Sequence, residues 1–338
     1  MPFAGTPHRR RPSGEPVVEA SPDTDAALLD VFSALSISRA AEDLLTALSE
    51  AGRIHHPRRR ALFREAGPVG IARAMRRPGD GTGDVLAPTF RAAGAMQLLG
   101  LDLDGFFRAH LRGEVAASRG LDLDLHHVDL ERGILAPVVP LGLLVEVVGG
   151  LALGFRMRGE DRVAIVCDSD GATSTGAWHE GLVFAAARRV PMVLVVETGL
   201  DDAALRRQTR VRSFTEKAAG YGITAASVDG ADALAVIDTV GAAIERARTG
   251  GGVQMVEIRY GGDDPIERLR RYMLDRGLAS AEDLERLARE AAAGCASAAE
   301  RVTDEAVPDI PDRFGGIYTD SDPSARRTWA GPRITEVV

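Results

Sequence analysis

The sequence predicts an α/β fold in which helices flank a doubly wound parallel sheet. Short apolar runs alternate with helical segments in the middle of the chain, as consecutive βαβ units require. The runs at 163–167 and 191–196 are almost entirely apolar, which is typical of strands that are buried on both faces. The C-terminal third has the composition of helices, so we expect a helical extension after the sheet.

The expected elements follow one another without an internal repeat. A long helix begins the ordered region and ends near Gly52, a plausible C-cap. The first βαβ unit should have a right-handed crossover. Ser213 and Glu216 fit a capping box that opens a short helix. The expected helices span 23–50, 176–189, 214–220 and 231–248, and the expected strands span 163–167, 191–196, 224–228 and 253–258.

The expected C-terminal extension consists of two helices. Asp264 and Pro265 supply an N-cap and a proline at the first helical position, and this helix should end at Gly277. Ser280 opens the next helix, which should run to about Val302. Pro-rich and Arg-rich composition predicts a loose N-terminal arm over 1–22 and an irregular tail over 308–338, which leaves 23–307 as one domain.

Composition excludes several classes of function. Lys and Arg total 41 against 49 Asp and Glu, a net charge of −8, which argues against general nucleic-acid binding. Cys167 and Cys295 offer neither a disulfide framework nor zinc spacing. No apolar run is long enough to cross a bilayer, and we expect a cytoplasmic location.

The turn at 168–174 is the strongest chemical signal. It lies between an apolar strand and a helix, so it should stand at the carboxyl edge of the sheet, where ligands bind. Asp170 offers a carboxylate to a hard cation such as Mg²⁺, and Gly171 lets backbone approach a phosphate at the helix N-terminus. Alternatively, Asp170 and Thr173 only cap the helix.

The segment Asp170-Gly171-Ala172-Thr173-Ser174, with the residues that follow it to Pro191, resembles the cofactor segment of the α subunit of thiamine-diphosphate-dependent 2-oxo acid dehydrogenases, the pyruvate and branched-chain E1 family. The stretches 84–91, 140–142, 264–272 and 276–278 resemble further parts of that subunit in the same order. The resemblance covers roughly 25–320 and implies the thiamine-diphosphate-binding fold.

The resemblance implies a role for particular residues. Thiamine diphosphate and Mg²⁺ would bind at an interface with a β-type subunit, which supplies the glutamate that activates the cofactor. Carbon dioxide would leave a 2-oxo acid, and the acyl group would pass to a lipoyl-bearing acyltransferase. Asp170 would be a metal ligand and His126 a catalytic histidine. The cofactor contacts would be Phe90, Arg91, Leu141, Gly142, Gly171, Ala172 and Gly199.

Three positions depart from the family pattern. Gly199 stands where the family has its second metal-binding asparagine, so that Asp201, Asp202 or Glu197 would have to replace that ligand. Phe90 stands where the family has a tyrosine. The loop after the last strand lacks the family's histidine, and no histidine follows His179. Proton transfer by such a histidine contributes about 10²–10⁴-fold to a rate.

The sequence leaves three hypotheses open. The chain is the α-type subunit of a dehydrogenase that works in a hetero-oligomer, or a homo-oligomer of the same chemistry. It is alternatively a catalytically retired relative that acts as a scaffold or regulatory partner of a β-type subunit. In the third case the shortened loop admits an acceptor other than a lipoyl arm.

Overall fold

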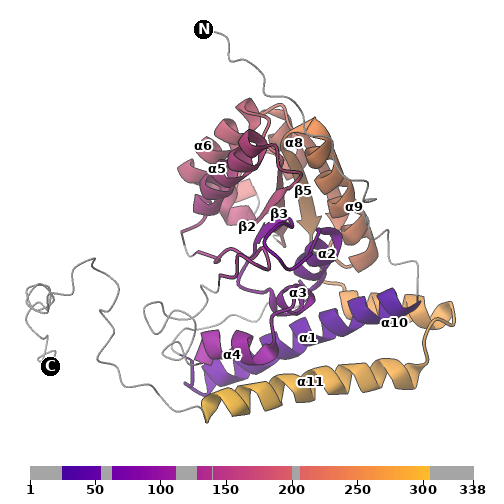
Figure 1. Ribbon diagram of the computed structural model, residues 1–338. Coiled ribbons are helices and arrows are strands. Elements are labelled where there is room, and N and C mark those ends of the chain that lie inside the picture. Colours follow the sequence, from indigo (N-terminus) through magenta and orange to yellow (C-terminus); the bar gives the residue numbers. More distant parts are fainter. Residues whose placement is uncertain (1–24, 55–62, 112–127, 139, 200–205, 305–338) are drawn as a thin grey trace, which may run out of the picture.

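The computed structural model describes residues 25–54, 63–111, 128–138, 140–199 and 206–304. Five strands form one sheet in the order β1-β2-β3-β5-β4, and every described pairing is parallel. The predicted fold class is confirmed (Figure 1). The strands are β1 (Val85–Ala87), β2 (Ala164–Ser169), β3 (Met192–Thr198), β4 (Thr224–Asp229) and β5 (Gln254–Arg259).

Helices cover both faces of the sheet. In β3, Val193 and Val195 belong to one core cluster, and Leu194 and Val196 belong to the other. This alternation is what a strand with two buried faces requires. Helices α5 (Leu143–Arg158), α6 (Gly176–Ala187) and α8 (Phe214–Ala219) contribute to the second cluster, and α2 (Ala66–Ala74) and α9 (Ala233–Arg246) to the first.

A layer of helices lies beneath the sheet, away from α5 and α6 (Figure 1). The long α1 packs along α11, and α4 packs against α11. Asp264 caps α10 with Pro265 at its start, and Ser280 caps α11, as predicted. The bounds are α1 (Asp25–Glu50), α3 (Ala93–Leu98), α4 (Leu103–Leu111), α10 (Pro265–Asp275) and α11 (Ala281–Thr303), with a π-helical turn η3 (Ala247–Gly251) after α9.

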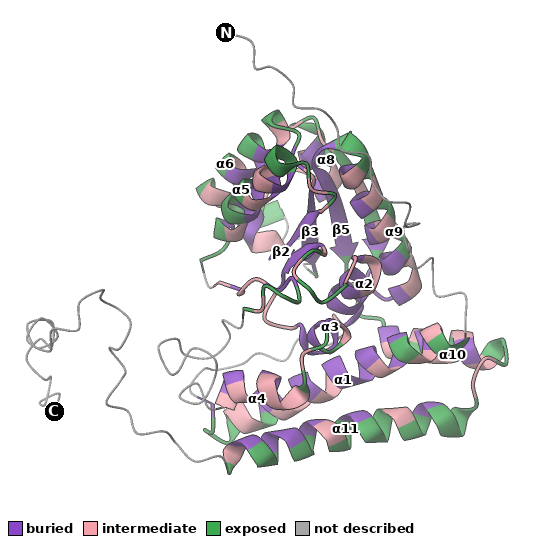
Figure 2. Cartoon of the chain, in the orientation of Figure 1, coloured by how far each residue is buried: buried purple, intermediate pink, exposed green. Residues whose placement is uncertain are grey.

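The structure adds elements that the sequence analysis did not assign, namely β1 and helices α2 to α5. Burial follows the layers, with purple faces turned toward the sheet and green faces toward solvent (Figure 2). Within the described ranges, no helix combines the length and the apolar character that crossing a bilayer requires. The proposed arm, 1–22, and tail, 308–338, lie outside the described residues, so the domain boundaries stay predictions.

A buried ion pair fastens the amino end of the sheet to η3. Arg248 donates to both carboxylate oxygens of Asp84, at 2.9 and 2.8 Å, and their side chains are 3% and 0% exposed. The backbone N–H groups of Arg76 and Val163 donate to the same carboxylate, each at 2.9 Å. Asp84 therefore joins the end of α2, the start of β1, the start of β2 and η3.

We expect Asp84→Asn to destabilise the fold strongly. The substitution removes the buried counter-charge of Arg248 and leaves the exposed Glu245 as its charged partner, and removing one partner of a buried pair costs about 3–5 kcal/mol. Urea unfolding measures this loss. Glu290→Gln is the matched control, because its pair with Arg286 is exposed and contributes less than about 1 kcal/mol. Equal losses in the two variants would contradict the assigned role of Asp84.

Candidate functional site

A cavity of about 200 Å³ opens at the carboxyl edge of the sheet. The cavity lies where three adjacent strands end. Its lining includes the loop after β1, the end of β2 and a residue near the end of β3. Parallel sheets place ligand sites at this edge. The lining residues are Arg64, Pro88, Thr89, Phe90, Arg91, Pro137, Val138, Pro140, Leu141, Gly142, Leu144, Cys167, Asp168, Ser169 and Glu197.

Four residues that the sequence singled out meet in this cavity. Phe90 and Arg91 come from the loop after β1, and Leu141 and Gly142 come from the start of α5. Gly142 has a φ of +82°, and a Cβ atom there would overlap the hydroxyl of Thr175 and lie 2.9 Å from the backbone nitrogen of Trp178. Only glycine fits at this position.

The turn after β2 lies beside the cavity. Asp170–Ser174 form a short 3-10 helix, η2, and Ser169 lines the cavity directly before it. A Cβ atom on Gly171 would lie 3.6 Å from the side chain of Leu141, which places this turn against the cavity wall. Ala172 is buried in the core instead.

The carboxylate of Asp170 is held by the chain itself. Its Oδ1 accepts from the backbone N–H of Gly171 at 2.7 Å, and its Oδ2 accepts from the hydroxyl of Thr198 at 3.3 Å. The cap of α6 is Thr175, which accepts from the N–H of Trp178, so the alternative in which Asp170 or Thr173 caps that helix is wrong.

Two predicted residues lie outside the described part of the chain, namely His126 and Asp201. Their roles stay predictions. Gly199 is described, and it lies against the guanidinium of Arg64 rather than in the cavity wall. The Nδ1 atom of His179 bonds to the hydroxyl of Tyr221, and this histidine does not line the cavity.

The cavity contains charged residues that the sequence analysis did not assign to the cofactor. Arg64 and Asp168 were missed, and Glu197 was considered only as a substitute metal ligand. Asp168 and Glu197 sit at the ends of two apolar strands, and a carboxylate in such a position is a signal that could have found them. Arg64 precedes α2 in a stretch without a recognisable pattern, and no comparable signal marks it.

Burial shifts the titration of both carboxyl groups. Desolvation raises the pKa of Glu197 to about 7, and the nearby Arg64 and Arg91 oppose this increase. Desolvation raises the pKa of Asp168 to about 6, against the backbone N–H groups of Ser169 and Gly142. Both groups therefore change charge close to neutral pH, which is common in functional sites.

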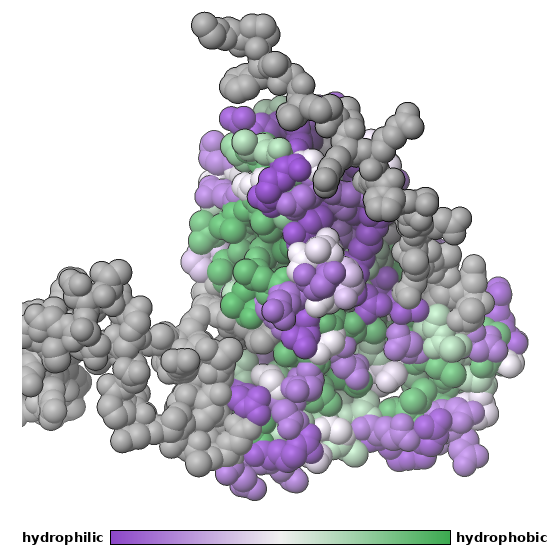
Figure 3. All heavy atoms as spheres, in the orientation of Figure 1, coloured by the Kyte–Doolittle hydropathy of each residue, from purple (hydrophilic) through white to green (hydrophobic). Residues whose placement is uncertain are grey.

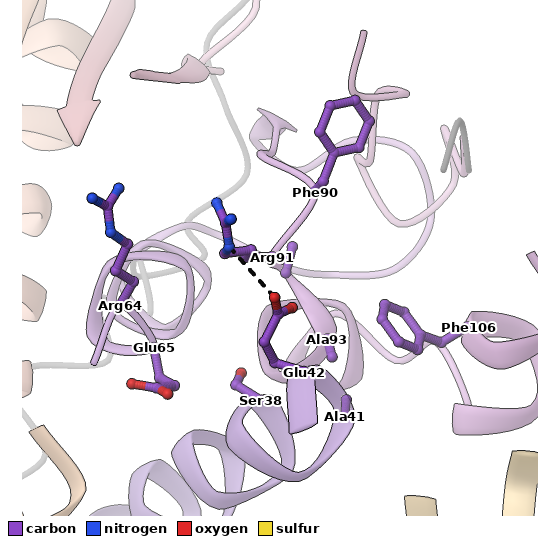
Figure 4. A pocket seen from close by; sticks show the side chains of 10 residues that line it. Ser38, Ala41, Glu42, Arg64, Glu65, Phe90, Arg91, Ala93 and Phe106 are labelled. Atoms are coloured by element: carbon purple, nitrogen blue, oxygen red, sulfur yellow. Dashed lines mark ion pairs between the residues drawn. The ribbon is translucent and has the colours of Figure 1, made fainter. Parts of the chain in front are cut away.

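The second arginine of the cavity, Arg91, lies close to a carboxylate of α1. The Nε atom of Arg91 lies 3.6 Å from Oε1 of Glu42 on α1. Figure 4 shows a smaller pocket that shares Arg64, Phe90 and Arg91 with this cavity; there the guanidinium groups of Arg64 and Arg91 point the same way, while Glu65 points away from them. Glu65 pairs instead with Arg39, which also bonds to Asp264 at 3.1 and 3.2 Å. The cavity can therefore bind an anion with its two arginines.

We expect stability to fall as the pH rises from 6 to 8, and Glu197→Gln to reduce that fall. The pKa of Glu197 is about 7 in the fold against 4.5 as the reference, so the protonated form stabilises the fold and this contribution is lost as pH rises through 7. The loss over this interval is about 1 kcal/mol. Urea unfolding at both pH values measures it. A variant with the native pH dependence would show that Glu197 is not the titrating group.

Comparison with known proteins shows the family to which the chain belongs. The model of the dehydrogenase E1 component family matches residues 34–262, which is more than half of the chain. The alpha subunit of the acetoin:2,6-dichlorophenolindophenol oxidoreductase of Cupriavidus necator is 29% identical over 280 residues, covering 75% of this chain and 83% of that protein.

Two Bacillus subtilis proteins are also similar. The alpha subunit of its pyruvate dehydrogenase E1 component is 27% identical over 339 residues, covering 90% of this chain and 86% of that protein. Its acetoin:2,6-dichlorophenolindophenol oxidoreductase alpha subunit is 33% identical over 177 residues, about half of each chain. The chain therefore belongs to the dehydrogenase E1 component family, as an α-like member.

Proposed function

We propose that this chain binds thiamine diphosphate as the α-type subunit of a 2-oxo acid dehydrogenase in the cytoplasm. The observation that carries the proposal is the cavity at the carboxyl edge of the sheet, because it gathers Arg91, Gly142 and the turn before Asp170 from distant parts of the chain. Thiamine diphosphate would supply the chemistry that removes carbon dioxide from a 2-oxo acid.

Particular residues would hold the cofactor. Arg91 presents a planar guanidinium that suits a diphosphate. Gly142 brings backbone to the cavity wall at a position where a side chain does not fit, and Leu141 and Phe90 give the wall apolar surface. Pro88 and Pro137 add rigid apolar surface beside them. The site thus has a cationic part and an apolar part, as an amphiphilic cofactor requires.

The described residues do not fit a divalent metal ion. Mg²⁺ needs several oxygen ligands in near-octahedral geometry. Both carboxylate oxygens of Asp170 accept hydrogen bonds from the chain, and Gly199 has no side chain. Among the described residues, no three His, Cys, Asp or Glu side chains gather as metal ligands would.

A retired active site is the second candidate function. The observation that favours it is the connection between β5 and α10, which consists of residues 260–264 and contains no histidine. Such a chain would keep the fold and the partner surface and would act as a scaffold or regulatory subunit. Cofactor binding separates the two candidates, since a scaffold has no need of it.

We expect thiamine diphosphate to stabilise the complex of this chain with its β-type partner. Arg91→Met should weaken the binding of thiamine diphosphate at least about tenfold, because a charge-assisted contact is lost. A ligand at 100 times its dissociation constant adds about 2.7 kcal/mol, which a thermal melt detects. The control is Arg271→Met, an exposed arginine on α10. No stabilisation of an intact native complex would favour the retired scaffold.

We further propose that the face of α5 and α6 binds the β-type partner. Hydrophobic side chains gather on this side of the molecule (Figure 3). Val147 on α5 and Val183 on α6 are 52% and 50% exposed, and Met157 and Phe184 are also exposed. Exposed apolar patches of this kind mark interaction surfaces. Through such a complex the chain would serve a lipoyl-bearing acyltransferase.

We expect Val147→Glu to abolish co-purification with the β-type chain, because a charge would be buried in the interface. The isolated variant should keep its stability, since surface substitutions change it by only about 0.5 kcal/mol. Val128→Glu is the matched control, because Val128 is 51% exposed and lies outside α5 and α6. Undiminished co-purification of the Val147 variant would place the interface elsewhere.

A further inference from the structure

The space beside position 199 is filled by another part of the chain. A Cβ atom built on Gly199 would overlap Nη2 of Arg64 and lie 3.2 Å from its Cζ. Any larger side chain at 199 would therefore displace this guanidinium. The position at which the related enzymes would carry a metal-binding side chain therefore lies against a positive charge.

The guanidinium of Arg64 is held in place without using its donors. It lies over the ring of Tyr260, 5.3 Å from the centroid, and its charge acts on the carboxyl group of Glu197. The hydroxyl of Tyr260 donates to the backbone carbonyl of Arg64 at 3.2 Å, which fixes the start of the side chain. Within the described residues, the guanidinium donates no hydrogen bond, so its donors are available to a ligand in the cavity.

A metal ion and this arginine exclude each other. A divalent cation close to the guanidinium would be repelled, and the repulsion is stronger in a partly buried site than in water. Each carboxylate oxygen of Asp170 already accepts one hydrogen bond, from the N–H of Gly171 and from the hydroxyl of Thr198. Glu197 also lines the cavity, and Arg64 is one of the two arginines whose charge favours its ionised form.

We propose that the cavity binds a diphosphate group without a divalent cation, with the guanidinium of Arg64 in the metal's place and Arg91 as the second cation. Guanidinium groups donate two parallel hydrogen bonds to a phosphate, which gives both charge and orientation. The identity of the ligand as thiamine diphosphate rests on the proposed function, whereas the recognition of a diphosphate by two arginines rests on the cavity itself.

Calorimetric titration of the complex with its β-type chain tests the proposal. The probes are inorganic diphosphate and thiamine diphosphate, each added once with EDTA and once with excess Mg²⁺. We expect the affinity for each probe in EDTA and in Mg²⁺ to agree within about threefold. This difference is smaller than the contribution of one charge-assisted contact. Binding that is more than about tenfold weaker in EDTA would overturn the proposal.

Variants of Arg64 test whether its guanidinium binds the diphosphate. Arg64→Met should weaken the binding of inorganic diphosphate at least about tenfold in EDTA. Arg64→Lys should retain part of the affinity because it keeps the charge. Arg271→Met should bind as the native chain does. Native affinity in Arg64→Met would overturn the role of Arg64.

A stability cycle tests the fit of Gly199 against Arg64 even if one variant binds poorly. Gly199→Ala should lower the unfolding midpoint in the native background and lower it much less in Arg64→Ala, since the overlap is then removed. Equal effects in both backgrounds would overturn the packing on which the proposal depends.

The two probes separate this proposal from the proposed function. If thiamine diphosphate binds only with Mg²⁺, the proposed function stands and the metal-free site is wrong. If inorganic diphosphate binds in EDTA but thiamine diphosphate does not bind at all, the metal-free site stands and the proposed cofactor is wrong. If neither probe binds in either condition, both are wrong.

Discussion

The contact of the Arg64 guanidinium with Gly199 is the constraint on which the candidate site depends. The guanidinium lies beside Gly199, so a metal-binding side chain at that position would have to displace it. The same charge, together with that of Arg91, acts on the buried carboxyl of Glu197. Asp170, the expected metal ligand, bonds to Gly171 and Thr198. The contact between Arg64 and Gly199 thus puts a positive charge where the family resemblance implies a metal ligand.

The sheet creates the conditions for this site. Strands β1, β2 and β3 are adjacent and parallel, so their carboxyl ends meet at one edge. Their interiors are buried on both faces, and β2 and β3 end in polar residues at this edge. Arginines and carboxylates can share this edge because their opposite charges offset part of the cost of burial.

The sequence predicted the strands well, because β2 and β3 are apolar runs with two buried faces and helices with clear caps follow. It did not predict β1, which has three residues, or the short α2 and α3, because so few residues show no periodic pattern of apolar side chains. It identified Arg91 and Gly142 through a family resemblance. It could not identify Arg64, since the fit to Gly199 is a tertiary contact between segments far apart in the chain.

Diffraction from crystals of the complex, grown with thiamine diphosphate and soaked in Mn²⁺, tests the metal-free site most directly. Mn²⁺ accepts the oxygen ligands that Mg²⁺ uses and gives an anomalous signal. The account predicts a diphosphate contacted by Arg64 and Arg91, with no anomalous peak between it and Asp170. A peak bonded to Asp170, with Arg64 turned away from Gly199, would contradict it.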